Sequence, residues 1–349
     1  MSQSTKKAWG TGKTEYFYQL DPSLVLKYVD LLGYSTTGRC LALNSLENRV
    51  YEIEIENPDA KNVSENFVIA KFYRPGRWSQ EQILEEHQFL KDLITIEIPA
   101  IAPLEINGQT LFKTQEEDGP LYYCLFPKRG GRNPDELRKE DISRLGRLMG
   151  RMHAVGKNRK FEHRITLSPQ IYGEDNLDSL LTENAIPEHY KANYEALARQ
   201  FISTIKPSFE KISYQRVHGD CHWGNLLHTE AEGFFFIDFD DVVSGPVVQD
   251  FWLMIPGRDD HSKAQREEFI ESYTMWADFS HRELALIEPL RGLRYLHFDH
   301  WIAKRWEDPS FPTAFPHFKE DRYWAERIND LREQISLCQN PYAYDPYEY

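Results

Sequence analysis

The sequence predicts an α+β protein with two lobes, a small β-rich N-lobe and a larger, mostly helical C-lobe. Short runs of β-branched and aromatic residues are concentrated before Pro127, whereas helical periodicity dominates after it. The chain has 349 residues, of which 41% are hydrophobic, and this is enough for a large core divided over two lobes. We therefore expect a flexible extension over residues 1–17, an N-lobe over 18–127 and a C-lobe over 128–349.

Charge and cysteine content narrow the class of partner. The formal net charge of −14 argues against a general nucleic-acid binder, because that function needs a dominant positive field. The four cysteines are widely spaced and form no C-x-x-C pair, which is typical of free thiols in a reducing compartment. The start of the chain shows no signal-like apolar segment, and no apolar run is long enough to span a membrane. We expect a cytoplasmic monomer with no nucleic-acid or membrane partner.

The first elements of the N-lobe are a short helix and a hairpin. Asp21-Pro22-Ser23 is a helix-start pattern, and the helix is expected to reach Leu32. Residues 41–56 have the β-branched character of a hairpin, with a polar turn that contains Ser45. We consider Ser45 a candidate phosphate contact. Simple turn chemistry is an equally good interpretation of that position.

A lysine inside an apolar strand is the first charged candidate. Lys71 lies in the strand predicted over Phe67–Phe72, where a charge is costly unless it has a counter-charge or a ligand. A solvent-facing lysine on an edge strand is the alternative. The next helix, predicted over Gln80–Ile94, has an apolar stripe of Ile83, His87, Leu90 and Ile94. Glu86 lies beside this stripe and Glu85 on the polar side, so Glu86 is the better partner for Lys71.

The central motif combines a polar loop with an acid-rich strand end. The loop reads His218-Gly219-Asp220-Cys221-His222-Trp223-Gly224-Asn225, and the apolar run that follows it ends in Asp238-Phe239-Asp240-Asp241. Phosphoryl transfer from a nucleotide needs one carboxylate for the attacking hydroxyl, and an Asn and another Asp for magnesium. The spacing from Asp220 to Asn225 is that of the kinase pattern H-R-D-x-x-x-x-N. We therefore predict Mg²⁺ and ATP as cofactor and co-substrate, catalytic roles for Asp220 and Asp238, and Asn225 and Asp238 as metal ligands.

Two other interpretations of this motif remain open. His218, Asp220, Cys221 and His222 could hold a transition metal in a hydrolase, but this leaves Asn225 and Asp238 without a role. The loop could also be an ordinary polar connection. The kinase interpretation explains more of the residues.

The kinase pattern gives functional meaning to positions on both sides of the motif. Val68-Ile69-Ala70-Lys71 resembles the V-A-I-K of kinases, whose lysine holds the α- and β-phosphates. In that architecture adenine would bond to the backbone near Phe126, at the end of the strand predicted over residues 121–126. Asp250 is interpreted as structural, holding the preceding loop by hydrogen bonds. The basic and aromatic stretch 288–305 could form an acceptor-side surface or a solvated helix face.

The whole pattern resembles a known family. The loop form H-G-D-x-H-x-x-N is that of the aminoglycoside phosphotransferase and choline kinase branch of the protein-kinase-like fold. Leu43–Tyr51, Lys71–Pro75, Gln82–His87, Glu288–Arg291 and Trp306–Pro309, together with the loop, resemble the bacterial stress response kinase A family.

This resemblance implies a cytoplasmic, magnesium-dependent serine/threonine protein kinase with a role in the stress response. It also implies that Asp220 is the proton acceptor, that Asn225 and Asp238 bind the metal and that Ser45 lies at the ATP site. A kinase of a small hydroxylated metabolite, such as homoserine, choline or an aminoglycoside, would carry the same core motifs. A nucleotide-binding pseudokinase is a further alternative.

Overall fold

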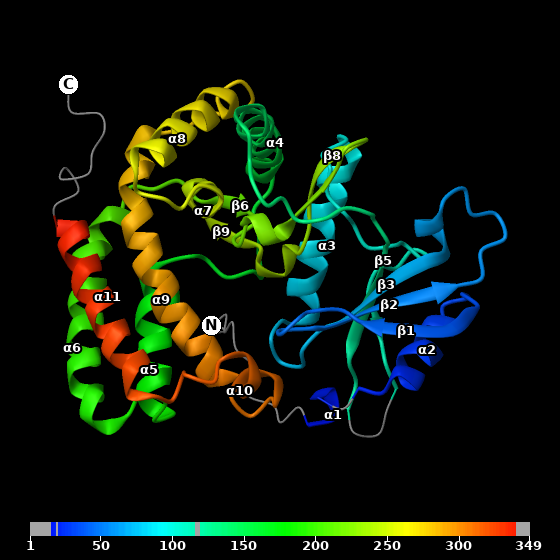
Figure 1. Cartoon of the computed structure of the whole chain (residues 1–349), viewed down its shortest axis with the longest axis horizontal. Helices are drawn as coiled ribbons and strands as arrows, with labels where there is room; N and C mark the ends of the chain where they lie inside the picture. The colour runs from blue at the N-terminus through cyan, green and yellow to red at the C-terminus, as the bar shows by residue number, and fades with distance from the viewer. Residues whose placement is uncertain (1–14, 19, 116–118, 340–349) are drawn as a thin grey trace. The chain divides into compact units, whose positions relative to one another are not determined.

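A computed structural model of the chain describes residues 15–18, 20–115 and 119–339 (Figure 1). Most of the predicted extension, residues 1–14, lies outside these ranges. The described chain contains a five-stranded antiparallel sheet near its start and many helices later, which confirms the predicted α+β class.

The chain folds into two compact units. Unit 1 contains the described residues up to Leu137 together with two later segments, 161–164 and 222–241. Unit 2 contains the rest of the described chain. Both later segments of unit 1 come from the part of the sequence assigned to the C-lobe, so the two units are interleaved along the chain.

Unit 1 is built on an antiparallel sheet with the strand order β1-β2-β3-β5-β4. Its strands are β1 (Thr36–Ala42), β2 (Arg49–Ile55), β3 (Phe67–Phe72), β4 (Phe112–Lys113) and β5 (Tyr122–Pro127). β1 and β2 form the predicted hairpin, although β1 begins earlier than expected. A tight turn at Asn107-Gly108 is also present, since both residues have positive φ and Ile106 pairs with Gln109 across them.

One face of this sheet carries the core of unit 1. Its side chains are Tyr51, Ile53 and Ile55 of β2, Val68, Ala70 and Phe72 of β3, and Tyr123 and Leu125 of β5. They are joined by the buried side of α2 (Pro22–Asp30) and by Phe17 of α1 (Glu15–Tyr18), which is 0% exposed. The packed core therefore includes the last residue of the predicted flexible extension. Because side chains alternate along a strand, Lys71 lies on the opposite face from its neighbour Phe72.

Helix α3 (Gln80–Thr95) is close to its predicted bounds and begins with a capping box formed by Ser79 and Gln82. Its buried side chains are Gln82, Ile83, Glu86, His87, Phe89, Leu90 and Leu93. Ile94, which was predicted to lie on the apolar stripe, is 44% exposed. At 3.6 residues per turn, Leu93 takes that place instead.

A two-stranded hairpin completes unit 1. It consists of β7 (Leu226–Thr229) and β8 (Gly233–Phe236), and it is flanked by the 3₁₀ turns η4 (Trp223–Asn225) and η5 (Phe239–Asp241). A third 3₁₀ turn, η1 (Val63–Asn66), precedes β3. The backbone of Phe236 donates to the carbonyl of Pro99, which ties the hairpin to the segment after α3.

Unit 2 is mainly helical. Its helices are α4 (Lys139–Lys157), α5 (Asp175–Thr182), α6 (Glu188–Ile205), α7 (Val248–Met254), α8 (Asp260–Tyr273), α9 (Ile287–Lys304), α10 (Ser310–Ala314) and α11 (Asp321–Gln339). Its shorter elements are the π-helical turn η2 (Pro169–Glu174), the 3₁₀ turns η3 (Lys206–Phe209) and η6 (His281–Leu286), and the strand pair β6 (Gln215–Val217) and β9 (Val243–Gly245). None of the helices in the described residues is long and apolar enough to cross a membrane.

Close helix packing holds unit 2 together. α4 and α8 lie side by side (Figure 1), and a Cβ added at Gly146 of α4 would come within 2.5 Å of the carbonyl oxygen of Phe269 on α8. Farther along the chain, the buried Asp299 of α9 accepts hydrogen bonds from Tyr194 of α6 and from Arg327 of α11. These contacts join α4 to α8, and α9 to α6 and α11.

Candidate active site

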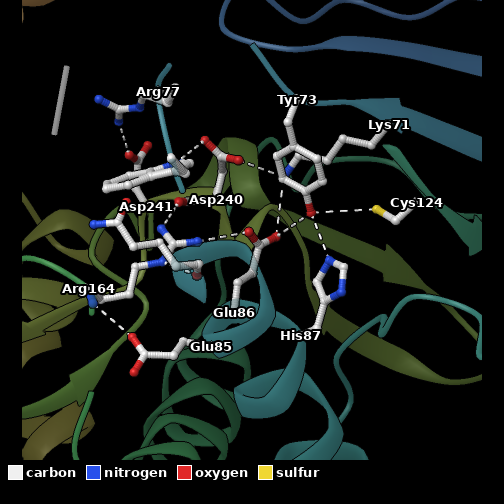
Figure 2. A network of polar contacts seen from close by, with 12 residues as sticks. Lys71, Tyr73, Arg77, Glu85, Glu86, His87, Cys124, Arg164, Asp240 and Asp241 are labelled. Carbon is white, nitrogen blue, oxygen red and sulfur yellow. Dashed lines mark hydrogen bonds and ion pairs between the residues drawn. The ribbon is translucent and has the colours of Figure 1, made fainter. Parts of the chain in front are cut away.

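Lys71 is the centre of a buried charged cluster in unit 1 (Figure 2). It lies in the third strand of the sheet order, its side chain is 7% exposed, and its Nζ is 3.3 Å from Oε1 of Glu86. The same nitrogen is 2.9 Å from Oδ1 of Asp240 and 3.9 Å from Oδ1 of Asp238. The alternative of a solvent-facing edge lysine is therefore wrong, and the predicted pairing of Lys71 with Glu86 is confirmed.

Arg164 holds the other side of Glu86. Its Nη2 is 3.0 Å from Oε2 of Glu86, its Nε donates to the carbonyl of Gln82, and its Nη1 donates to the carbonyl of Asp240. The guanidinium carbon lies 4.2 Å from the ring centroid of Trp78, and the residue is 0% exposed. Sequence reasoning missed Arg164, because it lies in a short segment between helices with no recognisable pattern.

Asp240 is the second residue that sequence reasoning missed. It is buried, pairs with Lys71, and accepts a hydrogen bond from Nε1 of Trp78 at 3.2 Å. Next to it, Asp241 forms an ion pair with Arg77. The signal was present in the run of three acids after β8, but only the first of them matches the kinase pattern.

Burial and charge act against each other in this cluster. Burial lowers the pKa of Lys71, but the carboxylates of Asp240 and Glu86 outweigh burial and raise it overall. Burial likewise raises the pKa of Asp240, but Lys71, Arg77 and Arg164 outweigh it, and the pKa is lowered. Burial raises the pKa of Glu86, and Lys71 opposes that rise. Lys71 and Asp240 are therefore charged at neutral pH, and the charge of each one favours the charged form of the other.

A neutral polar shell surrounds the cluster. The hydroxyl of Tyr73 lies 2.9 Å from Nε2 of His87 and 3.5 Å from Oε1 of Glu86, and Nδ1 of His87 lies 2.8 Å from the hydroxyl of Thr110. Burial lowers the pKa of His87 to about 3, helped by the positive charges of Lys71 and Arg164. This histidine is therefore uncharged at neutral pH and adds no charge to the cluster.

Glu85 differs from its prediction. It was placed on the polar side of α3, yet it is half-buried and accepts hydrogen bonds from the backbone N–H groups of Glu162, His163 and Arg164. Glu85 thus anchors the segment that carries Arg164. Glu85 and Glu86 of α3 therefore hold the same segment. Glu85 binds its backbone N–H groups, and Glu86 binds the side chain of Arg164.

The two predicted metal ligands lie at one end of the β7–β8 hairpin. Leu226 pairs with Phe236, and the backbone N–H of Ile237 donates to the carbonyl of Asn225 at 3.0 Å, so Asn225 and Asp238 adjoin the same end of the ladder. Asp238 has a φ of 58°, in the left-handed region that Asp tolerates better than most residues, and its side chain is 57% exposed.

This pair suits a hard cation. Carboxylate and amide oxygens are ligands that Mg²⁺ accepts, and Mg²⁺ usually keeps several waters and takes few protein groups. In the described residues, no group of three or more His, Cys, Asp and Glu is placed to hold a metal ion. Burial also raises the pKa of Cys221 well above its usual value, so this side chain is a thiol in the metal-free chain.

The Asp220 loop belongs to unit 2 and is held by Asp250. The two carboxylate oxygens of Asp250 accept the backbone N–H groups of His218, at 2.8 Å, and Gly219, at 2.7 Å. The carbonyl of Gly219, whose φ is +86°, accepts a hydrogen bond from Gln249. His153 is buried and lies 2.9 Å from Asp250. The predicted structural role of Asp250 is confirmed, and His153 supports it.

The side chain of Asp220 points to helix α9. Its Oδ1 accepts a hydrogen bond from Nη1 of Arg294 at 2.8 Å. Elsewhere in the predicted basic stretch, His300 and Arg305 are buried. The interpretation of this stretch as a solvated face is therefore wrong for His300 and Arg305. Arg294 of the same stretch contacts Asp220, the proposed base.

The weaker candidates lie in the sheet of unit 1. Ser45 is half-buried in the β1–β2 turn, and that turn is held by Arg74, which donates to the carbonyls of Leu46 and Glu47 at 2.9 Å each. Phe126 is half-buried in β5 opposite Ile69. Arg74 thus supports the backbone of this turn directly, and sequence reasoning did not anticipate that role.

The groups described above are of the types expected in a protein-kinase-like phosphotransferase. Comparisons with known proteins show that class. Residues 40–287 match the phosphotransferase enzyme family. The chain is 35% identical over 326 residues to stress response kinase A of Escherichia coli K12, covering 93% of this chain and 95% of that protein. It is 34% identical to the serine/threonine protein kinase RdoA of Salmonella typhimurium LT2, with the same coverage.

Solved structures of similar fold belong to the same branch. Amicoumacin kinase hAmiN, in complex with AMP-PNP, Ca²⁺ and Ami, has a TM-score of 0.73 at 20% identity and matches 93% of this chain and 96% of its own. The microcompartment-associated aminopropanol kinase has a TM-score of 0.66 at 18% identity, with 92% and 98% matched. The chain belongs to the phosphotransferase enzyme family and, within it, to the stress response kinase A group.

Proposed function

We propose that this protein is a magnesium-dependent serine/threonine protein kinase that transfers the γ-phosphoryl group of ATP to a protein hydroxyl in the cytoplasm. The observation that carries the proposal is the buried pair of Lys71 and Glu86, 3.3 Å apart, in a chain whose relatives are named as kinases. The names of those relatives support the stress response and the serine/threonine acceptor. We further propose that the protein acts as a monomer.

Unit 1 supplies the groups for the nucleotide. Lys71 would hold the α- and β-phosphates, with Glu86 and Asp240 fixing its position. Asn225 and Asp238 would hold Mg²⁺, which when bound neutralises charge on the β- and γ-phosphates. The turn at Ser45 would contact phosphate, and the backbone near Phe126 would bind adenine.

Unit 2 supplies the group for the acceptor. Asp220 would orient the hydroxyl and take its proton. The hydroxyl oxygen forms a bond to the γ-phosphorus, the bond from that phosphorus to the β–γ bridging oxygen breaks, and ADP leaves with the electron pair. Asp250 and Gln249 brace the backbone of the loop that carries Asp220.

A second candidate is a kinase of a small hydroxylated metabolite. Two solved structures of similar fold are named for kinases of amicoumacin and aminopropanol, which favours this candidate. The core groups would keep the same roles, since acceptor choice depends on other surfaces.

Transfer of label from γ-labelled ATP tests the proposal. Purified protein, Mg²⁺ and labelled ATP are incubated with and without cell extract, beside the matched variant Asp220→Asn. We expect label on Ser or Thr of protein, and none with the variant. Label confined to small molecules would replace the first candidate by the second. ATP binding without any transfer would identify a pseudokinase and contradict both.

A further inference from the structure

We propose that Arg294 selects the acceptor by binding a carboxylate that stands next to the hydroxyl to be phosphorylated. The acceptor in view is a Ser or Thr flanked by an acidic side chain. The inference rests on the proposed function, because it assigns the acceptor side of the same reaction. It starts from the contact between Nη1 of Arg294, on α9, and Oδ1 of Asp220 at 2.8 Å.

The Asp220–Arg294 pair can be opened by a ligand. The side chain of Arg294 is 39% exposed and that of Asp220 is 24% exposed. By contrast, the Arg164–Glu86 pair of unit 1 is 0% and 1% exposed. Solvent-accessible ion pairs contribute little to stability, so an acceptor can replace this contact at small cost.

The loop does not need Arg294 to keep its shape. Asp250 binds two of its backbone N–H groups, and Gln249 binds the carbonyl of Gly219. The strand before the loop is tied to the end of α4 by Arg216, which donates to the carbonyl of Val155. Arg294 therefore touches the functional carboxylate itself rather than the scaffold that carries it.

The guanidinium of Arg294 keeps donors available. Within the described part of the chain, Arg294 bonds to Asp220 through Nη1, and its Nε and Nη2 make no hydrogen bond or ion pair. One turn earlier, Arg291 is already committed, since it donates to the carbonyl of Pro256 and pairs with Glu288. Of these two arginines, Arg294 is the more accessible to a ligand, since its side chain is 39% exposed and that of Arg291 is 15% exposed.

The chemistry of these donors points to a carboxylate. A guanidinium is a planar fork that matches two carboxylate oxygens at once, and it repels an ammonium group. An acidic side chain is therefore favoured beside Asp220, and an amine is not.

Acceptor binding and catalysis are coupled through this exchange. An incoming carboxylate competes with Asp220 for the guanidinium and releases Oδ1 of Asp220 from Arg294. That oxygen then accepts the proton of the neighbouring hydroxyl as its oxygen bonds to the γ-phosphorus and ADP leaves. Arg294 is a specificity-determining residue in this scheme, and Asp220 remains the proton acceptor.

The test compares acceptor preference in the wild type, Arg294→Ala and Arg294→Glu. Arg322→Glu is the matched control, because Arg322 is an 84% exposed arginine on α11 that pairs with Glu326. The acceptors are Ser and Thr peptides flanked by Asp/Glu, by Lys/Arg or by neutral residues, together with small hydroxy acids and amino alcohols. Transfer is measured with labelled ATP, and binding is measured calorimetrically with matching peptides in which Ala replaces Ser or Thr.

We expect the wild type and Arg322→Glu to prefer acidic over basic acceptors by about 10-fold or more in kcat/KM, the usual size of a charge-assisted contact. The preference should vanish in Arg294→Ala and reverse in Arg294→Glu, with KM for ATP unchanged. Transfer with the same preference in all variants would overturn the inference and leave the kinase in place. Arg294-dependent binding of acidic peptides without any transfer would keep the inference and reject the proposed activity. Preference for small hydroxy acids over every peptide would keep the role of Arg294 and replace the protein acceptor.

Discussion

The charged groups of the two units are built in opposite ways. In unit 1, Lys71, Glu86 and Asp240 have side chains 7%, 1% and 5% exposed and share their contacts with Arg164. In unit 2, Asp220 is 24% exposed and has one arginine on its carboxylate oxygen. The first arrangement fixes charges permanently, whereas the second leaves a carboxylate that can change partner.

This difference matches the two tasks of a kinase. The nucleotide of the proposed reaction is the same in every cycle, so the lysine proposed to hold it benefits from a position fixed in advance. The acceptor must arrive, transfer a proton and leave, so its carboxylate must stay accessible. The buried cluster should therefore dominate stability, and the accessible pair should dominate turnover and choice of acceptor.

The largest expected effect is on turnover. Asp220→Ala should lower kcat by about 10²–10⁴-fold, the usual contribution of a positioned base. Asp238→Ala should abolish productive Mg-ATP binding, because one of the two proposed protein ligands for the metal is lost. Steady-state kinetics across a Mg²⁺ series separates the two variants. Full activity in either one would contradict its assignment.

Next in size is the stability of the buried cluster. Arg164→Ala leaves Glu86 without one of its two cations and should cost about 3–5 kcal/mol of unfolding free energy. Arg199→Ala is the matched control, since Arg199 pairs with three carboxylates but is 44% exposed. It should cost about 1 kcal/mol or less. Equal losses in a denaturant titration would show that burial does not distinguish the clusters.

A smaller effect is expected on the stability of the protein at acid pH, and it comes from His87. Its pKa is about 3 in the folded protein against an ordinary 6.5, so the unfolded chain binds one more proton between these values. The contribution of His87 to the free energy of unfolding is therefore fully present above pH 6.5. It falls by about 1.4 kcal/mol per pH unit as the pH drops towards 3. His87→Gln keeps a hydrogen-bonding side chain and should remove one proton from this dependence. Identical slopes for both proteins in unfolding titrations would reject a neutral His87.

The smallest effect should come from the accessible pair. Arg294→Ala should change unfolding free energy by about 1 kcal/mol or less, because an exposed ion pair contributes little. Thermal unfolding beside wild type measures it. A loss as large as that of Arg164→Ala would mean that Arg294 is structural, and would remove the contrast between the units.

Local sequence patterns were enough to predict the secondary-structure elements and to recognise the kinase-like loop. The strand with one lysine, the helix with Glu86 beside its apolar stripe and the hairpin at residues 41–56 were predicted from periodicity and composition. Asp250 could be assigned as a loop support from its place after the motif. These predictions depend on residues that are near each other in sequence or obey a spacing that chemistry imposes.

The residues that sequence reasoning missed, or whose role it left open, depend on distant contacts. Arg164 reaches Glu86 across 78 positions, and Arg294 reaches Asp220 across 74. Neither arginine differs locally from a surface arginine, so only the folded chain shows which one is buried and which one meets the base. Asp240 could be recognised as an acidic residue in the sequence. Its burial could not be predicted, because it lies in a 3₁₀ turn after the β8 strand.

ATP affinity and phosphoryl transfer, measured side by side in Asp220→Asn and Lys71→Met, test the central claim most directly. Calorimetry with Mg²⁺ and ATP gives the affinity, and single-turnover label transfer gives the chemical step. We predict that Asp220→Asn binds ATP as the wild type does but fails to transfer, whereas folded Lys71→Met loses affinity. Equal loss of ATP binding in both variants, or normal transfer by Asp220→Asn, would contradict the division of roles between the buried cluster and the accessible carboxylate.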